Sequence, residues 1–275
     1  MIAWVREVAP SLAHCELTFL EREPIDVARA ALQHRRYTVE LAALGCRIEW
    51  LPPLPQQPDG VFVEDTAVLV PELAVLTRPG VAARRGEVES VAAALGRHLP
   101  VARIEAPATL EGGDVLRIGR TFYVGTSGRS NPQGVAQLAA ALAPHGYAVR
   151  AVPMQGCLHL KSACTAIAPG RLLVNPEWVD AEQFDAATVI TVDESEPFAA
   201  NTLTFGGVTL VSTAYPRTRA RLAAAGIATR ALEVDELHKA EAALTCMSLL
   251  LGAPRSGPVK RRSASPRPVR TPYNR

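Results

Sequence analysis

The chain has 275 residues and lacks any run long and apolar enough to span a membrane, although 48% of its residues are hydrophobic. A membrane-spanning helix needs about 20 consecutive apolar residues, so we expect no membrane span. The N-terminal stretch carries a charged residue, Arg6, and has no small-residue cleavage site. Because a secretory signal needs an uninterrupted apolar stretch and such a site, we predict a cytoplasmic protein.

The sequence also lacks any Cys-x-x-Cys pair, and its five cysteines are an odd number. Both features disfavour a disulfide framework and a four-thiolate zinc site, so we expect reduced thiols. A free cysteine usually behaves as a small hydrophobe, so packing in the core is the default interpretation for each of them. The cysteines are Cys15, Cys46, Cys157, Cys164 and Cys246.

Acidic residues are absent from residues 252–275, which contain seven basic residues and five prolines. The rest of the chain therefore has 22 basic against 27 acidic residues, so the net charge of +2 conceals an acidic body. This segment has too few large apolar residues to form a core, so we predict a disordered basic tail after a folded domain of residues 1–251. The tail could touch nucleic acid or a membrane surface, but we favour a solvated tail without a fixed partner.

Apolar residues recur at helical spacing over residues 88–95 and 135–142, which predicts two helices. The second helix should begin after Asn131, because a capping residue followed by proline is typical of a helix start. Short β-rich runs lie between the helical segments, so we expect an α/β fold. Further helices are expected to start near Ile25, Pro216 and Asp235.

One pattern recurs between the helices: a polar residue at a strand start, an apolar strand, a tight turn and a second strand. The polar anchors are 49, 47, 40 and 45 residues apart, which indicates a repeated supersecondary unit. The last unit is incomplete, so we expect residues 1–50 to complete it and close a ring. The alternative is an ordinary α/β sheet with evenly spaced elements. The anchors are Asp65, Asp114, Lys161, Asn201 and Cys246.

Two pairs of carboxylates lie near these anchors. Glu64 and Asp65 interrupt an apolar strand segment, and Glu111 and Asp114 flank two glycines that allow a close backbone approach. Burying carboxylates is costly unless they meet a cation or several donors. We therefore expect a pocket that takes a positively charged ligand, with exposed turns as the alternative.

His159 and Cys246 are the candidates for acid–base and nucleophilic chemistry. His159 is the one histidine of six that we place at a repeat anchor, where an imidazole could transfer protons near neutral pH. Cys246 occupies the same position in its own unit, and a nearby cation would favour its thiolate. The rival thiol is Cys157, which we place on the same strand face as His159 and rank second.

Five motifs in order then resemble one known family. They are Phe62-Val-Glu-Asp-Thr-Ala, Glu111-Gly-Gly-Asp, Ser127-Gly-Arg-Ser-Asn, Leu158-His-Leu-Lys and Thr245-Cys-Met-Ser-Leu. The sequence resembles dimethylarginine dimethylaminohydrolase of the pentein, or guanidino-group-modifying, superfamily over about residues 1–251. The resemblance implies an α/β fold, a five-bladed propeller built from ββαβ-type repeats with pseudo-five-fold symmetry. One departure is Ser130, where the family usually has threonine.

The resemblance also implies roles for single residues. Cys246 would be the nucleophile, His159 the general acid and base, and Glu111 the carboxylate that orients the histidine. The other implied residues would bind the substrate: Asp65 with Glu64 at the guanidinium, Arg84 (or its neighbour Arg85) and Arg129 at the α-carboxylate, Asp59 near the α-amine, and Leu17 in a flexible lid.

The implied reaction is hydrolysis of Nω-methylated arginine to citrulline and dimethylamine or methylamine, through a covalent thiouronium on Cys246. It needs no metal and no organic cofactor. We expect a small-molecule substrate, no membrane partner and no nucleic-acid partner, and a homodimer is compatible with the sequence. The alternatives are an arginine deiminase, agmatine deiminase or amidinotransferase of the same fold, or a non-catalytic pentein-fold binding protein. The anchor spacings leave little room for the insertions of the longer enzymes, and two arginines at the α-carboxylate argue against agmatine.

Overall fold

The computed structural model describes residues 1–252, and the predicted tail lies almost wholly outside this range. Within it, fifteen strands form five three-stranded sheets. Four sheets follow chain order: β3(Ala67–Val70), β4(Leu73–Leu76) and β5(Val101–Arg103); β6(Val115–Ile118), β7(Thr121–Thr126) and β8(Ala148–Pro153); β9(Cys164–Ala168), β10(Arg171–Val174) and β11(Thr188–Thr191); β12(Leu203–Phe205), β13(Val208–Ser212) and β14(Thr229–Leu232). The fifth consists of β15(Leu249–Leu251), β1(Ile2–Val5) and β2(Arg47–Trp50).

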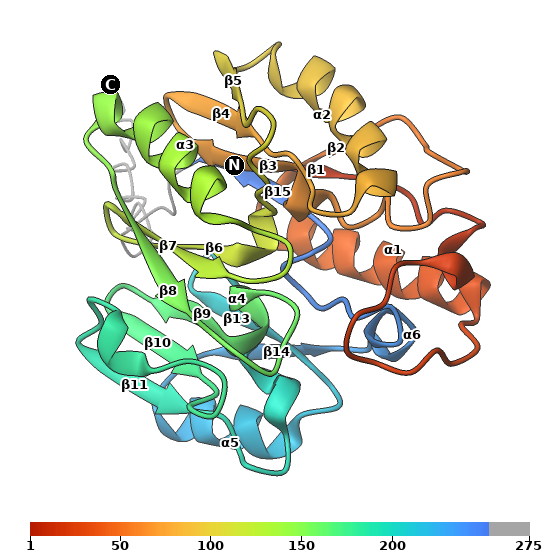
Figure 1. The fold of residues 1–275 in the computed structure, drawn as a ribbon. Coiled ribbons are helices and arrows are strands. Elements are labelled where there is room, and N and C mark those ends of the chain that lie inside the picture. The colour runs from red at the N-terminus through yellow and green to blue at the C-terminus, as the bar shows by residue number, and fades with distance from the viewer. Residues whose placement is uncertain (253–275) are drawn as a thin grey trace, which may run out of the picture.

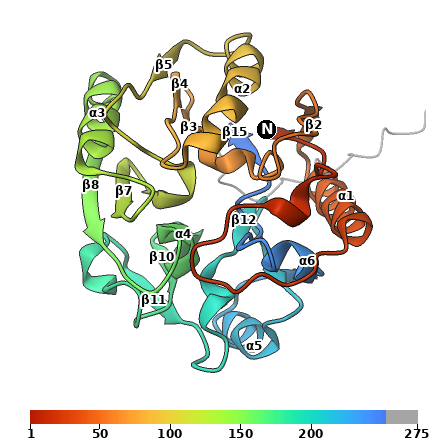
Figure 2. The same cartoon turned by 45° about the vertical axis from the view of Figure 1, so that its right-hand side comes forward.

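The fifth sheet joins the two ends of the described chain and closes the ring. β15 pairs antiparallel with β1, so that Ile2 lies opposite Leu251. The remaining strand, β2, runs parallel to β1. Figure 2 shows the five sheets arranged around a centre, with α1, α2, α3 and α5 on the outside. The expected five-unit propeller, completed by residues 1–50, is confirmed.

Two kinds of connection produce the strand order of the units. In the four units that follow chain order, a short turn joins the first two strands into an antiparallel hairpin. A glycine with positive φ lies in three of these turns, as at Gly119 (φ 61°) and Gly170 (φ 69°), whereas Pro71 and Glu72 form the turn between β3 and β4. The third strand runs parallel to the second, which requires a crossover connection, usually a helix. The unit of β9–β11 differs, because its crossover contains only a single 3-10 turn, Ala181–Gln183.

The predicted helices are present. The helix expected after Asn131 is α3, whose side-chain cap accepts a hydrogen bond from the backbone N–H of Gly134 at 2.9 Å. The helix expected near Ile25 begins two residues later, after the cap Asp26. In chain order the helices are α1(Val27–Ala43), α2(Glu87–Leu95), α3(Pro132–Leu142), α4(Leu160–Ala163), α5(Pro216–Ala224) and α6(Asp235–His238).

The polar anchors differ from the expectation in one respect: they do not lie within strands. Asp65 lies in the 3-10 turn Val63–Thr66 before β3, and Asp114 lies in the turn Gly112–Asp114 before β6. His159 is the N-cap residue of α4, so placing it on a strand face together with Cys157 was wrong. A single helical turn precedes the first strand in each of the four units that follow chain order, whereas residues 244–247 before β15 form a turn that is not helical.

Apolar side chains fill the space between neighbouring sheets and the outer helices. One of the five clusters combines Val75 of β4, Val124 of β7 and Leu138 of α3, all fully buried. Figure 1 shows α1, α2, α3 and α5 at the periphery of the molecule, outside the strands. The central turns instead carry buried polar side chains such as those of Asp65 and Asp114. None of the helices in residues 1–252 is long and apolar enough to cross a membrane.

Candidate active site

A narrow cavity of about 20 Å³ lies among the central turns. It has room for little more than one water molecule. Its walls combine charged side chains, a histidine and a cysteine with Glu16, the first residue of segment 16–26, which we call the lid segment. The lining residues are Glu16, Asp59, Phe62, Asp65, Arg84, Arg129, Leu158, His159, Ala240, Glu241, Ala242 and Cys246.

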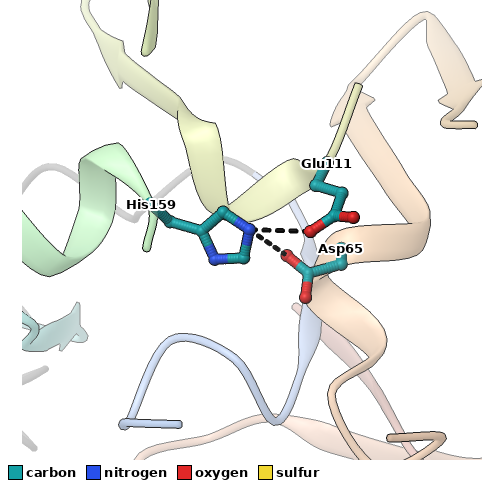
Figure 3. Close-up of side chains that lie close together, drawn as sticks. All are labelled: Asp65, Glu111 and His159. Atoms are coloured by element: carbon teal, nitrogen blue, oxygen red, sulfur yellow. Dashed lines mark hydrogen bonds and ion pairs between the residues drawn. The ribbon is translucent and has the colours of Figure 1, made fainter. Parts of the chain in front are cut away.

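A histidine and two carboxylates meet in this region (Figure 3). The Nε2 atom of His159 lies 2.7 Å from Oε2 of Glu111 and 4.0 Å from Oδ1 of Asp65. All three side chains are at least 95% buried. They come from the turns before three successive units of the ring, so the fold brings together residues that are 46 and 48 positions apart in the sequence.

Backbone groups hold the two carboxylates in place. The N–H of Gly113 donates to Oδ1 of Asp65 at 2.9 Å, and the N–H of Gly80 donates to Oε1 of Glu111 at 3.0 Å. A Cβ atom on Gly113 would lie 2.6 Å from Nδ1 of His159 and 2.8 Å from Oδ1 of Asp65. Only glycine permits this approach, as the Gly112-Gly113 pair led us to expect.

The side chain of His159 is a positively charged imidazolium at neutral pH. Burial by itself would lower its pKa, but Asp65, Asp114 and Glu111 outweigh burial and raise the pKa to about 9. Burial likewise opposes ionisation of Asp65, yet the charges of His159 and Arg84 lower its pKa to about 2. The cluster is therefore an imidazolium held by two carboxylates, ready to donate a proton.

Cys246 differs from the other four cysteines in its exposure. Cys15, Cys46, Cys157 and Cys164 are buried, as expected of core residues, whereas Cys246 is only partly buried and lines the cavity. Burial and the charges of Glu64 and Asp65 raise the pKa of Cys246 to about 12. The thiol is thus protonated in the free protein and needs a cation in the cavity to ionise.

Asp114 is a buried carboxylate whose role the sequence did not reveal. One oxygen accepts hydrogen bonds from the hydroxyl groups of Ser127 and Ser130, each at 2.6 Å. The other accepts from the N–H of Leu160 at 3.1 Å, directly after His159. Burial raises the pKa of Asp114 to about 6, although His159 and the two hydroxyls oppose this shift. Asp114 therefore fixes the backbone that carries the histidine and adds a negative charge near it.

We predict that Asp114→Asn lowers the pKa of His159, because the imidazolium loses one of the three carboxylates that stabilise it. An NMR titration of His159 in the variant should show its transition at lower pH than in the wild type. The control is Asp180→Asn, because Asp180 only caps a 3-10 turn at the surface and asparagine caps as well. An unchanged His159 titration in Asp114→Asn would contradict the assignment.

Glu64 faces away from the cavity, in contrast to the expectation that it binds substrate beside Asp65. Its carboxylate accepts hydrogen bonds from Nζ of Lys161 and from the hydroxyl of Thr245. It lines a separate cavity bordered by the first strands of the five units, β3, β6, β9, β12 and β15. Neighbouring residues in an extended chain or a tight turn point in different directions, so Asp65 and Glu64 cannot both face one small ligand. Glu64 and Lys161 instead form an ion pair behind the site.

Arg84, Arg85 and Arg129 differ in the hydrogen bonds that their guanidinium groups already make within the protein. Arg84 donates to Oδ2 of Asp65 at 2.8 Å and to Glu87, so a substrate carboxylate would have to replace these bonds. Arg85 bonds to backbone carbonyls of Pro79 and Gly80 and does not line the cavity. Arg129 lines the cavity, and its Nη2 donates to the hydroxyl of Thr18 at 2.9 Å.

Asp59 and Leu17 lie at the lid side of the site. Oδ2 of Asp59 accepts from the N–H of Glu16 at 3.2 Å, and burial raises the pKa of this carboxyl. The side chain of Leu17 does not line the cavity but packs against an apolar cluster that includes Cys246. The structure thus places Asp59 at the cavity, whereas Leu17 is represented there by its neighbour Glu16.

Comparison with known proteins decides the family. A sequence model described as arginine deiminase matches residues 51–203. An N(G),N(G)-dimethylarginine dimethylaminohydrolase from Pseudomonas aeruginosa is 38% identical over 228 residues, which are 82% of this chain and 89% of the relative. The chain belongs to the dimethylarginine dimethylaminohydrolase family.

Two further comparisons agree with this assignment. A dimethylarginine dimethylaminohydrolase from Streptomyces coelicolor is 38% identical over 251 residues, 90% of this chain and 96% of the relative. The P. aeruginosa member also has a solved structure, a cysteine-to-serine mutant complexed with citrulline. It matches with a TM-score of 0.84 and 34% identity, over 90% of this chain and 97% of that chain.

Asp65, Glu111 and His159 also have the spacing of a metal site, since one ligand atom of each lies within 4.8 Å of the others. The chemistry of these three side chains fits a protonated histidine better than a bound metal ion. Nε2 of His159 carries the proton that bonds Glu111, and the guanidinium of Arg84 already neutralises Asp65. In this family member we therefore interpret the cluster as a proton donor.

Three features of the family member escaped the sequence reasoning. Besides Asp114, these are the N–H of Gly80 on Glu111 and the carboxylate of Glu241 in the cavity wall. The position of Asp114 could have been recognised from the sequence, because it is a repeat anchor in the Glu-Gly-Gly-Asp motif. The other two left no such signal, since backbone donors and a helix-flanking glutamate look ordinary in a sequence.

Proposed function

We propose that this family member hydrolyses the Nω-methylated guanidinium group of arginine derivatives, giving citrulline and dimethylamine or methylamine. The observation that carries the proposal is the contact of His159 with Glu111 and Asp65 in the same cavity as the partly exposed residue Cys246. The names of relatives 38% identical to the chain, and a related structure with citrulline, support the substrate class.

Cys246 is the proposed nucleophile. The guanidinium cation of the substrate enters a cavity with the carboxylates of Asp65 and Asp59 and favours the thiolate, so the thiol proton leaves to solvent. The sulfur then bonds to the central guanidinium carbon and gives a tetrahedral adduct. The high pKa of the thiol without substrate fits this order, because the nucleophile ionises only when its target is bound.

His159 is the proposed acid and then base. Its imidazolium gives a proton to the methylated nitrogen, the carbon–nitrogen bond breaks, and the amine leaves, so that a thiouronium remains on Cys246. The neutral imidazole next takes a proton from a water molecule that adds to the same carbon. Cleavage of the carbon–sulfur bond releases the ureido group of citrulline and restores the thiol. Glu111 orients the imidazole throughout.

The other site residues are proposed to position the substrate. Asp65 would bind guanidinium nitrogens with the lone pairs that Arg84 and Gly113 leave free. Arg129 would bind the α-carboxylate, and Arg84 would assist if its bond to Asp65 is exchanged. Asp59 would accept from the α-amine, and Leu17 would contribute through the lid backbone. Glu64 would act indirectly, because its bond to Thr245 supports the residue before Cys246.

The test is incubation with asymmetric dimethylarginine, monomethylarginine, arginine and agmatine, with the ureido product and the released amine measured separately. We expect citrulline with dimethylamine or methylamine from the two methylated substrates. Ammonia and citrulline from arginine alone would instead indicate an arginine deiminase, the activity named by the matching family model. Binding of these compounds without turnover would indicate a non-catalytic protein.

We also propose that residues 1–251 form the catalytic unit and that residues 252–275 are dispensable for chemistry, because every residue assigned above precedes the tail. A variant that ends at Gly252 should keep kcat/KM for dimethylarginine within about twofold of the full chain, as expected when no group near the substrate is lost. A steady-state assay of both forms checks this. A drop of roughly tenfold or more would assign the tail a part in the site.

A further inference from the structure

The lid segment, residues 16–26, has no helix or strand of its own and is held by side chains from distant parts of the ring. Figure 2 shows this part of the chain crossing the face of the ring between α1 and α4. Asp59 accepts the N–H of Glu16, and Arg129 donates to the hydroxyl of Thr18. The segment therefore covers the cavity, which in this state is too small for an amino acid.

The carboxylate of Glu241 accepts more hydrogen bonds from this segment than any other side chain of residues 1–252. Its Oε2 accepts the N–H of Thr18 at 2.9 Å, and its Oε1 accepts the N–H groups of Phe19 and Leu20. Three successive backbone donors thus converge on one anion, an arrangement whose hydrogen bonds are stronger than those between neutral groups. These donors bond to no helix or strand partner, so the carboxylate determines where the lid backbone lies.

Glu241 occupies a backbone conformation that glutamate adopts rarely. Its φ is +54°, the only positive φ of a non-glycine residue within residues 1–252. Glycine would take this conformation without strain, whereas a residue with a Cβ atom destabilises the fold slightly there. The backbone conformation therefore favours glycine at this position, and the contribution of Glu241 lies in its side chain.

Glu241 also belongs to the wall of the cavity, five residues before Cys246. The same side chain therefore contacts the lid and borders the space around the nucleophile. Two hydrogen bonds to the lid come from Asp59 and Arg129, which are proposed to bind the substrate. A bound ligand therefore competes with the lid for these two side chains. The bonds to Glu241 use backbone donors of the lid and remain available when the substrate is present.

We propose that Glu241 is a positioning residue that latches the lid segment over the bound amino acid. The lid opens to admit the substrate, and the carboxylate then captures the N–H groups of residues 18–20 and closes the site. The proposal rests on the proposed function for the identity of the ligand. The latch itself involves only groups of this chain, so it can be tested without turnover.

The first experiment measures hydrogen exchange at the amides of Thr18, Phe19 and Leu20 in the full-length protein. Glu241→Gly should speed their exchange roughly tenfold or more, because three charge-assisted bonds are lost. This variant also relieves the positive φ, which offsets part of the lost bonding. It should therefore still unfold in one cooperative thermal transition, which separates a lost latch from a damaged fold. Glu241→Gln keeps the shape of the side chain but not its charge, so its exchange rates at residues 18–20 should lie between those of the wild type and Glu241→Gly.

The matched control is Glu21→Gln, because Glu21 is an exposed acid within the lid for which the structure records no hydrogen bond among residues 1–252. It should exchange at residues 18–20 as the wild type does. Equal exchange in Glu241→Gly and the wild type would overturn the latch, whether or not the protein hydrolyses methylated arginine.

The second experiment divides the effect between KM and kcat. Glu241→Gly should raise KM for dimethylarginine roughly tenfold and change kcat much less, because closure holds the substrate while His159 and Cys246 stay in place. Faster exchange at residues 18–20 with an unchanged KM would show that Glu241 orders the loop without positioning substrate, and would overturn the proposal. If the wild type lacks this activity, the proposed function fails while the exchange data still decide the latch.

Discussion

Cys246→Ser is expected to lower the hydrolysis of dimethylarginine by roughly 10⁴-fold or more, because a serine hydroxyl has no activating base in this cavity. His159 cannot serve as that base in the free protein, since Asp65, Asp114 and Glu111 keep it protonated against the effect of burial. A thiol can still ionise beside a guanidinium cation, but a hydroxyl, with a much higher pKa, cannot. Release of citrulline in a discontinuous assay measures the loss.

The matched control for this variant is Cys157→Ser. Cys157 is buried, lies two residues from His159, and burial raises its pKa to about 12. Its thiol donates to the carbonyl of His159, a bond that serine can also make. Full turnover in Cys246→Ser together with a loss in Cys157→Ser would transfer the nucleophilic role to Cys157. Isothermal titration with citrulline would show that the Cys246→Ser variant keeps its binding site.

His159→Asn should reduce kcat by roughly 10²–10⁴-fold, since both the leaving amine and the attacking water depend on its proton transfer. It should also change how stability depends on pH. The folded-state pKa of about 9 lies above the ordinary value of 6.5, so this group stabilises the fold fully below pH 6.5. That stabilisation disappears as the pH rises through about 9.

Urea unfolding of the wild type and of His159→Asn at a series of pH values tests this directly. The wild type should lose free energy of unfolding between pH 6.5 and 9, and the variant should show a flatter profile over this window. His145→Asn is the control, because His145 lies in the 3-10 turn that follows α3 and lines neither cavity. Equal slopes in wild type and His159→Asn would mean that the imidazole is neutral in the folded protein.

The sequence predicted the ring well because its signals are local and repeated. Asn131 and the following proline mark a helix start in any context, and the spacing of anchors such as Asp65 and Asp114 reports the length of each unit. The convergence of Asp65, Glu111 and His159 followed from that spacing. Their exact atomic partners, such as the N–H of Gly80, depend on how separate units pack and leave no trace in composition.

The direction of single side chains was harder to predict. Glu64 and Asp65 are adjacent, and the family resemblance led us to assign both to the substrate, yet only Asp65 lines the cavity. A turn of 3-10 helix separates neighbouring side chains by about a third of a rotation, so one faces inward and the other does not. The pairing of Arg84 with Asp65 was also hidden, because two residues nineteen positions apart give no periodic signal.

The pairing of β15 with β1 has a consequence for how the protein is made. Cys246 lies three residues before β15, and the strand that pairs with β15 through backbone hydrogen bonds is β1, the first strand of the chain. During synthesis β1 can pair early with β2, but its other neighbour β15 is made after every other strand of the ring. An unfinished polypeptide already contains the carboxylates and the histidine but cannot place the thiol among them. The reactive centre thus arises only after synthesis has passed β15, and translation products that stop before this strand are catalytically silent.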